Sequence, residues 1–381
     1  MVREAVIVQA VRTPIGRRNG ILSSIRPDEM LSLVLSEVVK RAGISKKEID
    51  DVICGCVTQC SEQAANIARI AALIAGFPKE VPGVTIDRQC GSSEQAIHFA
   101  AQAILSGDMD VVIASGVESM SRVPMFSQFQ GRKESKRLSD QYEMVHQGLS
   151  AERIADNWNL SRQQLDEFAL SSHQKAIRAR EKFKQEMMPL DIEVNGEKHR
   201  VTEDEGPRDN TSLAKLSNLK TPFLENGRIT AGNASQISDG AAAILIMSKE
   251  KALQLGVKGK FRIVARTVVG SDPTLMLTGP IFATKKVLQK AGLTLKDIDL
   301  FEINEAFASV PLVCEKELGI NRDKINVNGG AIALGHPLGA TGARMMTTLC
   351  HELERSGLRY GLTAICEGYG MANATIIERI K

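Results

Sequence analysis

One cysteine stands at a turn between a strand-like segment and a helical one. Residues 84–86 are Val, Thr and Ile, and the segment after residue 90 places Ala and Ile side chains on one helical face. Free backbone N–H groups and the helix dipole at such a turn favour a Cys90 thiolate and a developing oxyanion. Cys90 is therefore a candidate nucleophile, or alternatively a small buried cysteine. Glu94, one turn later, would raise the pKa of the thiol if its carboxylate faced the sulfur.

A glycine-rich turn carries the second candidate residue. Residues 327–343 read VNGGAIALGHPLGATGA. The glycine spacing fits neither a dinucleotide-binding loop nor a P-loop, so the turn is not a standard phosphate cradle. A histidine held between Gly335 and Pro337 suits a positioned base or hydrogen-bond donor. The alternative role of His336 is to cap a turn.

Two further polar groups follow strand-like segments. Asn304 comes directly after residues 300–303, where its side chain either orients a water or substrate oxygen or caps a helix. Cys366 ends the segment 363–366, where a second thiol would transfer protons if it lay beside the first; the alternative is an inert buried cysteine. All four candidates lie at strand ends followed by turns, which is where open α/β sheets place their sites.

An internal repeat relates these turns to one another. Residues 41–50 read RAGISKKEID and residues 290–299 read KAGLTLKDID, 249 positions later. The same offset aligns Cys90 with Gly339, each in a turn that opens a helix. Strands and helices alternate in both copies, so the repeat predicts a duplicated α/β fold.

A more polar segment, residues 117–238, separates the two copies. It contains several prolines and one expected helix at about residues 161–184. A plain loop of this length is unusual in a compact domain, so we expect a long insertion that carries binding function. The first half then comprises residues 1–116 and 239–258, and the second half comprises residues 259–381.

Composition limits the classes of function. The chain has 381 residues, is 43% hydrophobic and has a net charge of +3, which suits a large core in two or three units and disfavours a nucleic acid partner. Its most basic stretch, residues 132–137, indicates a solvated loop or an electrostatic guide for an anionic ligand. We expect no membrane association, because no apolar run reaches the roughly 20 residues that span a bilayer.

The cysteines favour a reducing compartment. Seven cysteines, an odd number, in a long chain without a signal-like N-terminus indicate free thiols and a cytoplasmic location. Cys54, Cys56 and Cys60 lie close together but lack a second Cys or His pair downstream, so we expect no metal site.

Several dispersed motifs resemble those of the thiolases, the acetyl-CoA acyltransferases. Residues 7–16 (IVQAVRTPIG), 116–121 (GVESMS) and 230–235 (TAGNAS) fit in order, together with the four turns above, so the resemblance covers essentially the whole chain. It implies a duplicated, five-layered αβαβα fold with a long inserted loop domain, and a homotetramer built from dimers.

The resemblance also implies catalytic roles. Cys90 takes the acyl group, and His336 accepts the Cys90 proton. His336 and a water held by Asn304 form one oxyanion hole, and the backbone N–H groups of Cys90 and Gly368 form the other. Cys366 moves the proton to and from the enolate or the coenzyme A thiol.

By the same resemblance, coenzyme A is a substrate, and no cofactor or metal is bound. The inserted region binds coenzyme A, with Ser235 near the pantetheine arm and Lys220 near the nucleotide end. His146 and Phe307 line the acyl pocket.

Four residues depart from the family pattern. Asp87 stands where the family usually has Asn, Glu94 where it has an apolar residue, Gln147 where it has Met, and Tyr369 where it has Gly. A tyrosine is costly if the hairpin needs a positive φ there. Gln147 and Tyr369 also bear on the shape of the acyl pocket, so the acyl chain length stays open.

Three functions remain under consideration. The first is thiolase activity, either thiolysis of a 3-oxoacyl-CoA or the reverse condensation to acetoacetyl-CoA. The second is a decarboxylating ketoacyl synthase-like enzyme, which typically uses one cysteine with two histidines or with histidine and asparagine; Cys366 and Asn304 favour the first. The third is a catalytically degenerate acyl-CoA-binding protein, suggested by Glu94 and Tyr369.

Overall fold

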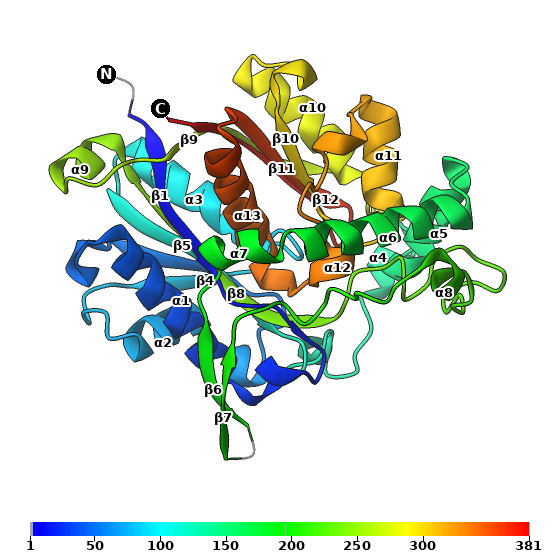
Figure 1. Cartoon of the computed structure of the whole chain (residues 1–381), viewed down its shortest axis with the longest axis horizontal. Helices are drawn as coiled ribbons and strands as arrows, with labels where there is room; N and C mark the ends of the chain where they lie inside the picture. The colour runs from blue at the N-terminus through cyan, green and yellow to red at the C-terminus, as the bar shows by residue number, and fades with distance from the viewer. Residues whose placement is uncertain (1–2, 195, 381) are drawn as a thin grey trace.

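Two matching α/β halves make up the computed structural model, which describes residues 3–194 and 196–380 (Figure 1). The first half contains β1 (Ala5–Arg12), α1 (Pro27–Ala42), β3 (Asp51–Gly55), α3 (Ser92–Ser106), β5 (Val111–Ser119) and β8 (Ser238–Ser248). The second contains β9 (Phe261–Gly270), α10 (Gly279–Ala291), β10 (Leu300–Ile303), α13 (Thr341–Ser356), β11 (Tyr360–Glu367) and β12 (Met371–Arg379). The starts of β3 and β10, of α3 and α13, and of β5 and β11 are each 249 residues apart, which confirms the repeat.

The two copies use the same local signals to bound their helices. Pro27 begins α1 and Pro280 lies in the first turn of α10, where a missing N–H costs nothing. Gly43 and Gly292 end these helices in the left-handed region, with φ of 71° and 65°. A glycine adopts this conformation without a Cβ clash, so each chain reverses sharply toward its next strand.

The strand order shows the same symmetry. It runs β10-β11-β12-β9-β1-β8-β5-β3-β4, with β4 at Gly83–Ile86. Counted outward from the centre of this order, β1 corresponds to β9, β8 to β12, β5 to β11 and β3 to β10. A short antiparallel contact, in which Val6 pairs with Arg262 and Ile7 with Phe261, joins the two halves.

Helices form the remaining layers of a five-layered αβαβα arrangement. α3 and α13 pack against each other between the two halves of the continuous sheet. α1 and α2 (Ile67–Ile74) cover the outer face of the first half, and α10 covers the second beside α11 (Ser309–Leu318). The predicted apolar face of α3 is fully buried; its members are Ala96, Ile97, Ala100, Ala101 and Ile104. The small alanines allow both the sheet and the second helix to approach closely.

The segment between β5 and β8 contains more than the one helix predicted from sequence. Its elements are α4 (Lys136–Ser139), α5 (Gln147–Asn157), α6 (Arg162–Arg178), α7 (Arg180–Glu186), β6 (Leu190–Val194), β7 (Glu197–Val201) and α8 (Leu213–Ser217). The expected helix is α6 and α7, opened by a Ser161–Gln164 capping box and interrupted at Ala179. The prediction of one helix was wrong because α4 and α8 are too short for a clear apolar period, and because α5, whose apolar face is at least as distinct as that of α6, was overlooked.

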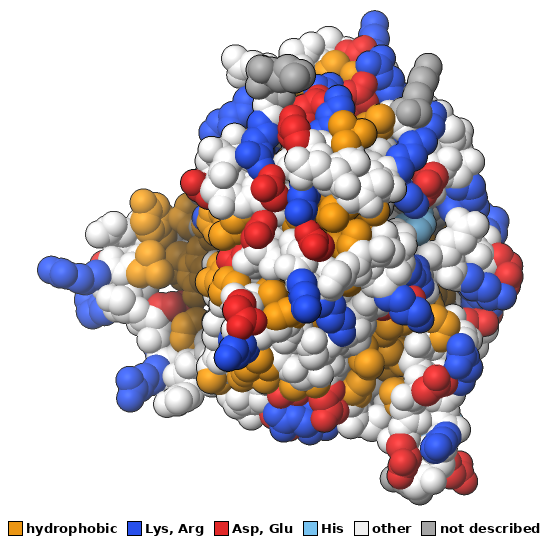
Figure 2. Space-filling model, turned by 90° about the vertical axis from the view of Figure 1, so that its left-hand side faces the viewer, with side chains coloured by type: hydrophobic (Ala, Val, Ile, Leu, Met, Phe, Trp, Pro, Cys, Tyr) orange, Lys and Arg blue, Asp and Glu red, His pale blue; other side chains and the backbone are white. Residues whose placement is uncertain are grey.

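A hairpin projects from this segment. β6 and β7 pair antiparallel and extend away from the body of the molecule, with Lys, Arg, Asp and Glu side chains along them (Figures 1 and 2). None of the helices in the described residues is long and apolar enough to cross a membrane.

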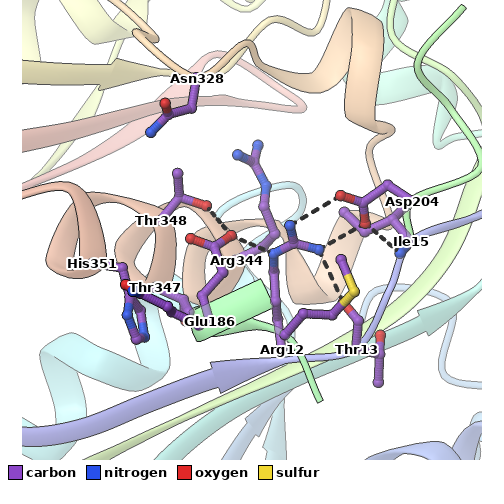
Figure 3. A network of polar contacts seen from close by, with 12 residues as sticks. Arg12, Thr13, Ile15, Glu186, Asp204, Asn328, Arg344, Thr347, Thr348 and His351 are labelled. Atoms are coloured by element: carbon purple, nitrogen blue, oxygen red, sulfur yellow. Dashed lines mark hydrogen bonds and ion pairs between the residues drawn. The ribbon is translucent and has the colours of Figure 1, made fainter. Parts of the chain in front are cut away.

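A buried ionic cluster fixes the inserted segment to both halves (Figure 3). Arg12 of β1 donates from Nε to Glu186 Oε1 at 2.6 Å and from Nη1 to Asp204 Oδ1 at 2.7 Å. Thr348 of α13 donates to Glu186 Oε1 at 2.9 Å, and the N–H of Ile15 donates to Asp204 Oδ1 at 2.8 Å. The two carboxylates raise the pKa of Arg12 against the opposing effect of its burial. The loops that carry the site are therefore anchored in the core.

Candidate active site

Cys90 lies in the turn between β4 and α3, as the sequence predicts. The side chain of Asp87 accepts the N–H of Gln89 at 2.6 Å, and Gln89 adopts a positive φ of 48°. Ser92 Oγ accepts the N–H of Arg88 at 2.9 Å and donates to Gln89 O at 2.6 Å. These bonds hold the turn and place Cys90 at the positive end of α3.

The pKa of the Cys90 thiol differs from the sequence expectation. This pKa is raised to about 12, chiefly by burial and to a smaller degree by the charge of an ionised Glu367, with the N–H of Cys90 itself opposing the increase. The predicted lowering was wrong, because desolvation of the thiolate outweighs the helix terminus.

The expected influence of Glu94 is not found. Glu94 Oε1 accepts hydroxyl protons from Thr363 at 2.7 Å and Thr375 at 2.6 Å, so this carboxyl is engaged by β11 and β12. Glu367, which follows Cys366, acts on the thiol instead. The sequence signal that could have identified Glu367 is an acidic residue directly after a cysteine at the end of a strand.

The hydrogen bonds of His336 define its tautomer. Thr341 Oγ1 donates to Pro337 O at 3.0 Å and lies 2.7 Å from His336 Nδ1. Because the hydroxyl has one proton, Nδ1 must donate to it, which leaves Nε2 with a free lone pair. Burial, and to a smaller degree the charge of Arg344, lower the pKa of His336 to about 3, so the ring is neutral. His336 can thus accept a proton at Nε2.

Asn304 lies beside this nitrogen. Asn304 Nδ2 is 3.4 Å from His336 Nε2, and Asn304 Oδ1 is buried without a hydrogen-bond partner among the described residues. The helix-cap alternative is wrong, because α11 begins at Ser309 with Ala308 as its N-cap. The Asn304 amide is available to a water or a substrate oxygen.

The glycine-rich turn serves close packing. Gly335 has a φ of 109°, and a Cβ there would lie 2.2 Å from Ser238 Oγ. A Cβ on Gly342 would lie 2.3 Å from the backbone nitrogen of Glu94, so the starts of α13 and α3 touch. This contact brings the His336 turn to the Cys90 turn, the two positions that the repeat relates.

Glu118 ties these loops together. Its carboxylate accepts the N–H groups of Val57 at 2.9 Å, Thr58 at 3.1 Å and Gly339 at 2.9 Å. One buried carboxylate of the first half thereby holds a turn of the second. The sequence motif containing Glu118 was recognised, but its binding role was not.

The β11–β12 hairpin contributes Cys366, Gly368 and Tyr369. Burial raises the pKa of the Cys366 thiol well above its usual value, and the charge of Cys90 contributes in the same direction. A Cβ on Gly368 would lie 2.9 Å from Gln89 Oε1, so the hairpin touches the nucleophile turn. Tyr369 has a φ of 62°, the conformation for which the sequence predicts a cost, and its hydroxyl donates to Glu134 Oε1 at 3.3 Å.

Two adjoining cavities open at these residues. The inner cavity, about 260 Å³, is mostly apolar, and the residues around it include Val57, Gln89, Cys90, Phe126, Phe129, Glu134, Met144, Met276, Gly368 and Tyr369. The outer cavity, about 560 Å³, is lined among others by Arg17, Arg18, Arg208, Phe223, Ser235, Phe307 and His336. Four residues line both: Met125, His146, Gln147 and Leu338. Cys90 and the three arginines therefore border connected space.

The structure places most of the predicted binding residues on these walls. Ser235 lines the outer cavity and His146 lines both, whereas Lys220 is exposed and lies outside both linings. Phe307, which we expected in the acyl pocket beside His146, lines only the outer cavity and not the one that Cys90 borders. Phe223, which the sequence analysis missed, stacks on His146 at 5.1 Å between ring centroids and meets Phe307 edge-on at 6.2 Å. These rings form a continuous aromatic wall.

The cysteines outside the site are free thiols. Cys54 and Cys56 are buried and Cys60 is partly exposed. Within residues 3–194 and 196–380, no group of three or more His, Cys, Asp and Glu side chains is arranged to hold a metal ion.

The chain was compared with known proteins. The family model "Thiolase, N-terminal domain" matches residues 5–250, and "Thiolase, C-terminal domain" matches residues 257–379. A steroid 3-ketoacyl-CoA thiolase of Mycobacterium tuberculosis is 47% identical, with 99% of this chain and 94% of that protein covered. A 3-ketoacyl-CoA thiolase of Bacillus subtilis is 42% identical over 99% of both chains. The crystal structure of the Bacillus anthracis acetyl-CoA acetyltransferase superposes with a TM-score of 0.93 at 41% identity, covering 100% of this chain and 99% of that one.

Proposed function

Because the chain belongs to the thiolase family, we propose that it carries an acyl group on Cys90 between a 3-oxoacyl-CoA and coenzyme A. In the first step Cys90 attacks the 3-oxo carbon, the bond between C2 and C3 breaks, and acetyl-CoA leaves as its enolate. In the second step the thiol of coenzyme A attacks the acyl group on Cys90. The products are acetyl-CoA and the shortened acyl-CoA, and the reverse reaction is a condensation.

The observation that carries this proposal is the meeting of four groups at connected cavities. Cys90 and Gly368 border the inner cavity, His336 borders the outer one, and Asn304 lies beside His336. Both the thiol and the imidazole are neutral at rest, so we expect the thiolate to form when His336 Nε2 takes the Cys90 proton as substrate binds. Covalent catalysis then divides one difficult step into two easier ones.

Two sets of donors stabilise the developing negative charge in this proposal. The N–H groups of Cys90 and Gly368 serve the carbonyl that Cys90 attacks, and His336 with an Asn304-bound water serves the thioester oxygen of the enolate. One oxyanion donor is worth about 3–4 kcal/mol in typical sites. Cys366, next to Cys90, protonates the enolate and accepts the proton of the coenzyme A thiol.

Coenzyme A occupies the outer cavity. Arg17, Arg18 and Arg208 supply positive charge for its phosphates, and Ser235 with the aromatic wall suits the pantetheine arm. Most of these residues belong to the inserted region, residues 117–238, to which we assign coenzyme A binding, with residues 1–116 and 239–258 and residues 259–381 as the catalytic halves. Lys220, at the surface, is placed near the nucleotide end.

The acyl group occupies the inner cavity. Its walls are largely Val, Met, Phe and Leu side chains, which favours an apolar acyl chain. A thiolysis assay across 3-oxoacyl-CoA chain lengths tests this. A protein that binds acyl-CoA without turning any of them over would support the degenerate-binder alternative, and decarboxylation of a malonyl thioester would support the ketoacyl synthase-like one. The comparisons favour neither alternative.

We also propose a cytoplasmic homotetramer built from dimers. β4 is an edge strand with Val84 41% exposed, and the adjacent α2 exposes Leu73 and Ile74 by 48% and 50%. Hydrophobic side chains also gather along one flank of the molecule (Figure 2). Such surfaces suit an interface between copies. Light scattering should give four times the chain mass of 41.4 kDa; a monomer would contradict it.

A further inference from the structure

Glu367 is a buried carboxyl that the proposed reaction does not use. It is the last residue of β11, directly after Cys366, and it is 0% exposed. With the Asn373 amide turned to face it, Asn373 Nδ2 donates to Glu367 Oε1 at 2.7 Å. Glu367 Oε2 has no hydrogen-bond partner within the described chain. A carboxyl in this position needs an explanation, since an unpaired buried charge is costly.

The Glu367 carboxyl lies against the backbone of the nucleophile turn. A Cβ built on Gly91 would lie 1.9 Å from Glu367 Oε1, so the carboxyl occupies the place of a side chain at Gly91. Gly91 follows Cys90 and is the N-cap of α3. Any charge on Glu367 therefore acts one residue from the nucleophile and beside Cys366.

The charged groups around Glu367 do not balance if every one of them is ionised. Arg88 and Asp87 act on it from the nucleophile turn, and Glu94 acts on it from α3. Arg88 is the cation among the groups that act on Glu367, no ion pair joins the two side chains in the described residues, and Arg88 Nε finds no acceptor there. Two carboxylates beside one cation in a dry site leave a net negative charge, so one carboxyl must keep its proton.

The other neighbours do not change this balance. From β12, Asn373 contributes a neutral amide. On α3, burial lowers the pKa of His98 to about 3, so its ring is neutral too, and Arg266 of β9 faces that histidine. Burial raises the pKa of Glu367 well above its usual value although Arg88 opposes this, and burial raises that of Glu94 to about 7. Glu367 is the carboxyl that keeps its proton.

We propose that Glu367 is a positioning residue which, by holding its proton, keeps the space beside Gly91 in the nucleophile turn uncharged so that Cys90 can ionise. This inference rests on the proposed role of Cys90. When Glu367 does release its proton, to solvent, its charge opposes the Cys90 thiolate. Arg88 has the opposite influence, because its loss removes a positive charge from the nucleophile turn and from beside Glu367.

The test measures the rate of Cys90 alkylation by iodoacetamide against pH, with the Cys90 peptide followed by mass spectrometry. Glu367→Gln keeps the shape of the protonated carboxyl, so its alkylation rate should match that of the wild type near pH 7. Because wild-type Glu367 ionises at higher pH and the variant cannot, the midpoint of the variant's profile should lie about one unit lower. Arg88→Gln should move the midpoint to higher pH. Glu143→Gln, which removes an exposed carboxyl paired with Arg153 of α5, is the matched control and should reproduce the wild-type profile.

Shifts of opposite sign support the proposal, because loss of packing alone would move both variants in the same direction. A Glu367→Gln rate well above the wild-type rate already near pH 7 would show that Glu367 is ionised there and overturns the proposal, and so does a midpoint equal to or above that of the wild type. If that variant does not fold, Arg88→Gln decides alone, and an unchanged or lower midpoint overturns the proposal. Acylation of a residue other than Cys90 would instead refute the proposed function, so the two failures are distinguishable.

Discussion

His336 Nδ1 lies 2.7 Å from Thr341 Oγ1, and this single contact determines which imidazole nitrogen can act as a base. The Thr341 hydroxyl donates to Pro337 O, so Nδ1 carries the ring proton and Nε2 faces Asn304 without one. Position and protonation state of the base therefore come from one residue in the first turn of α13.

Thr341→Val should lower kcat/KM about 10- to 100-fold, because the ring is then free to turn and to move its proton to Nε2. Thr341→Ser keeps the hydroxyl and should retain most of the activity. Both are measured in the thiolysis assay with matched circular dichroism spectra. Wild-type rates in Thr341→Val would show that the contact does not orient the base.

Cys90→Ser should abolish acyl transfer, because a serine hydroxyl in this site is a far weaker nucleophile than a thiolate. Mass spectrometry after incubation with acetyl-CoA should show an acetyl adduct on Cys90 of the wild type and none on the variant, with coenzyme A affinity retained. Cys60→Ser, at a partly exposed thiol outside the cavities, is the control and should keep full activity. Substantial turnover by Cys90→Ser would refute the mechanism.

Glu94→Gln should stabilise the protein more at pH 8 than at pH 5. The pKa of Glu94 is about 7 in the folded protein against an ordinary value of 4.5, so its ionisation destabilises the fold progressively from about pH 4.5 to 7 and fully above that. The gain in unfolding free energy should be about 1–3 kcal/mol larger at pH 8, as measured by urea denaturation. Glu143→Gln should show no such dependence, and a gain independent of pH would contradict the buried ionisation.

Tyr369→Gly should not lower the melting temperature, because it relieves a positive φ that costs a tyrosine about 1 kcal/mol. It also enlarges the inner cavity and should shift the preference toward longer or bulkier acyl chains. Tyr369→Phe keeps the backbone cost and removes only the bond to Glu134, so it should retain the wild-type chain-length profile. Identical profiles for the glycine and wild-type proteins would show that Tyr369 does not limit the acyl group.

Arg12→Met should destabilise the fold by about 3–5 kcal/mol, because it leaves the buried carboxylates of Glu186 and Asp204 without their cation. Arg200→Met, which breaks an exposed pair with Asp191 on the β6–β7 hairpin, should cost less than about 1 kcal/mol. Urea denaturation of both variants measures the difference. Equal costs would mean that the buried cluster does not anchor the inserted segment.

Local signals account for what the sequence predicted correctly. The repeat at residues 41–50 and 290–299 gave the correct offset because helix ends depend on nearby residues such as Gly43 and Gly292. The turn at Cys90 was predicted from β-branched residues followed by small ones, a pattern read within a few positions. The individual roles of the site residues in the reaction stay predictions.

What the sequence could not supply depends on contacts between distant residues. The orientation of Glu94 is set by Thr363 and Thr375, which lie over 260 positions away. The effect of Glu367 on Cys90 arises because β11 ends against Gly91. A thiol pKa depends on desolvation by the whole surrounding fold, so a helix start alone predicted the wrong direction.

The two halves meet through equivalent elements: β1 against β9, antiparallel, and α3 against α13. A contact between equivalent surfaces is the geometry of a two-fold dimer, so the chain has the architecture of a dimer whose subunits are covalently joined. Fusion lets the two copies of one turn diverge independently, which identical subunits cannot do. One copy now presents Cys90, and the other, with Gly339 at the matching position, presents His336. A symmetric ancestor would have had two identical turns at this junction; the single asymmetric site is a consequence of the covalent link.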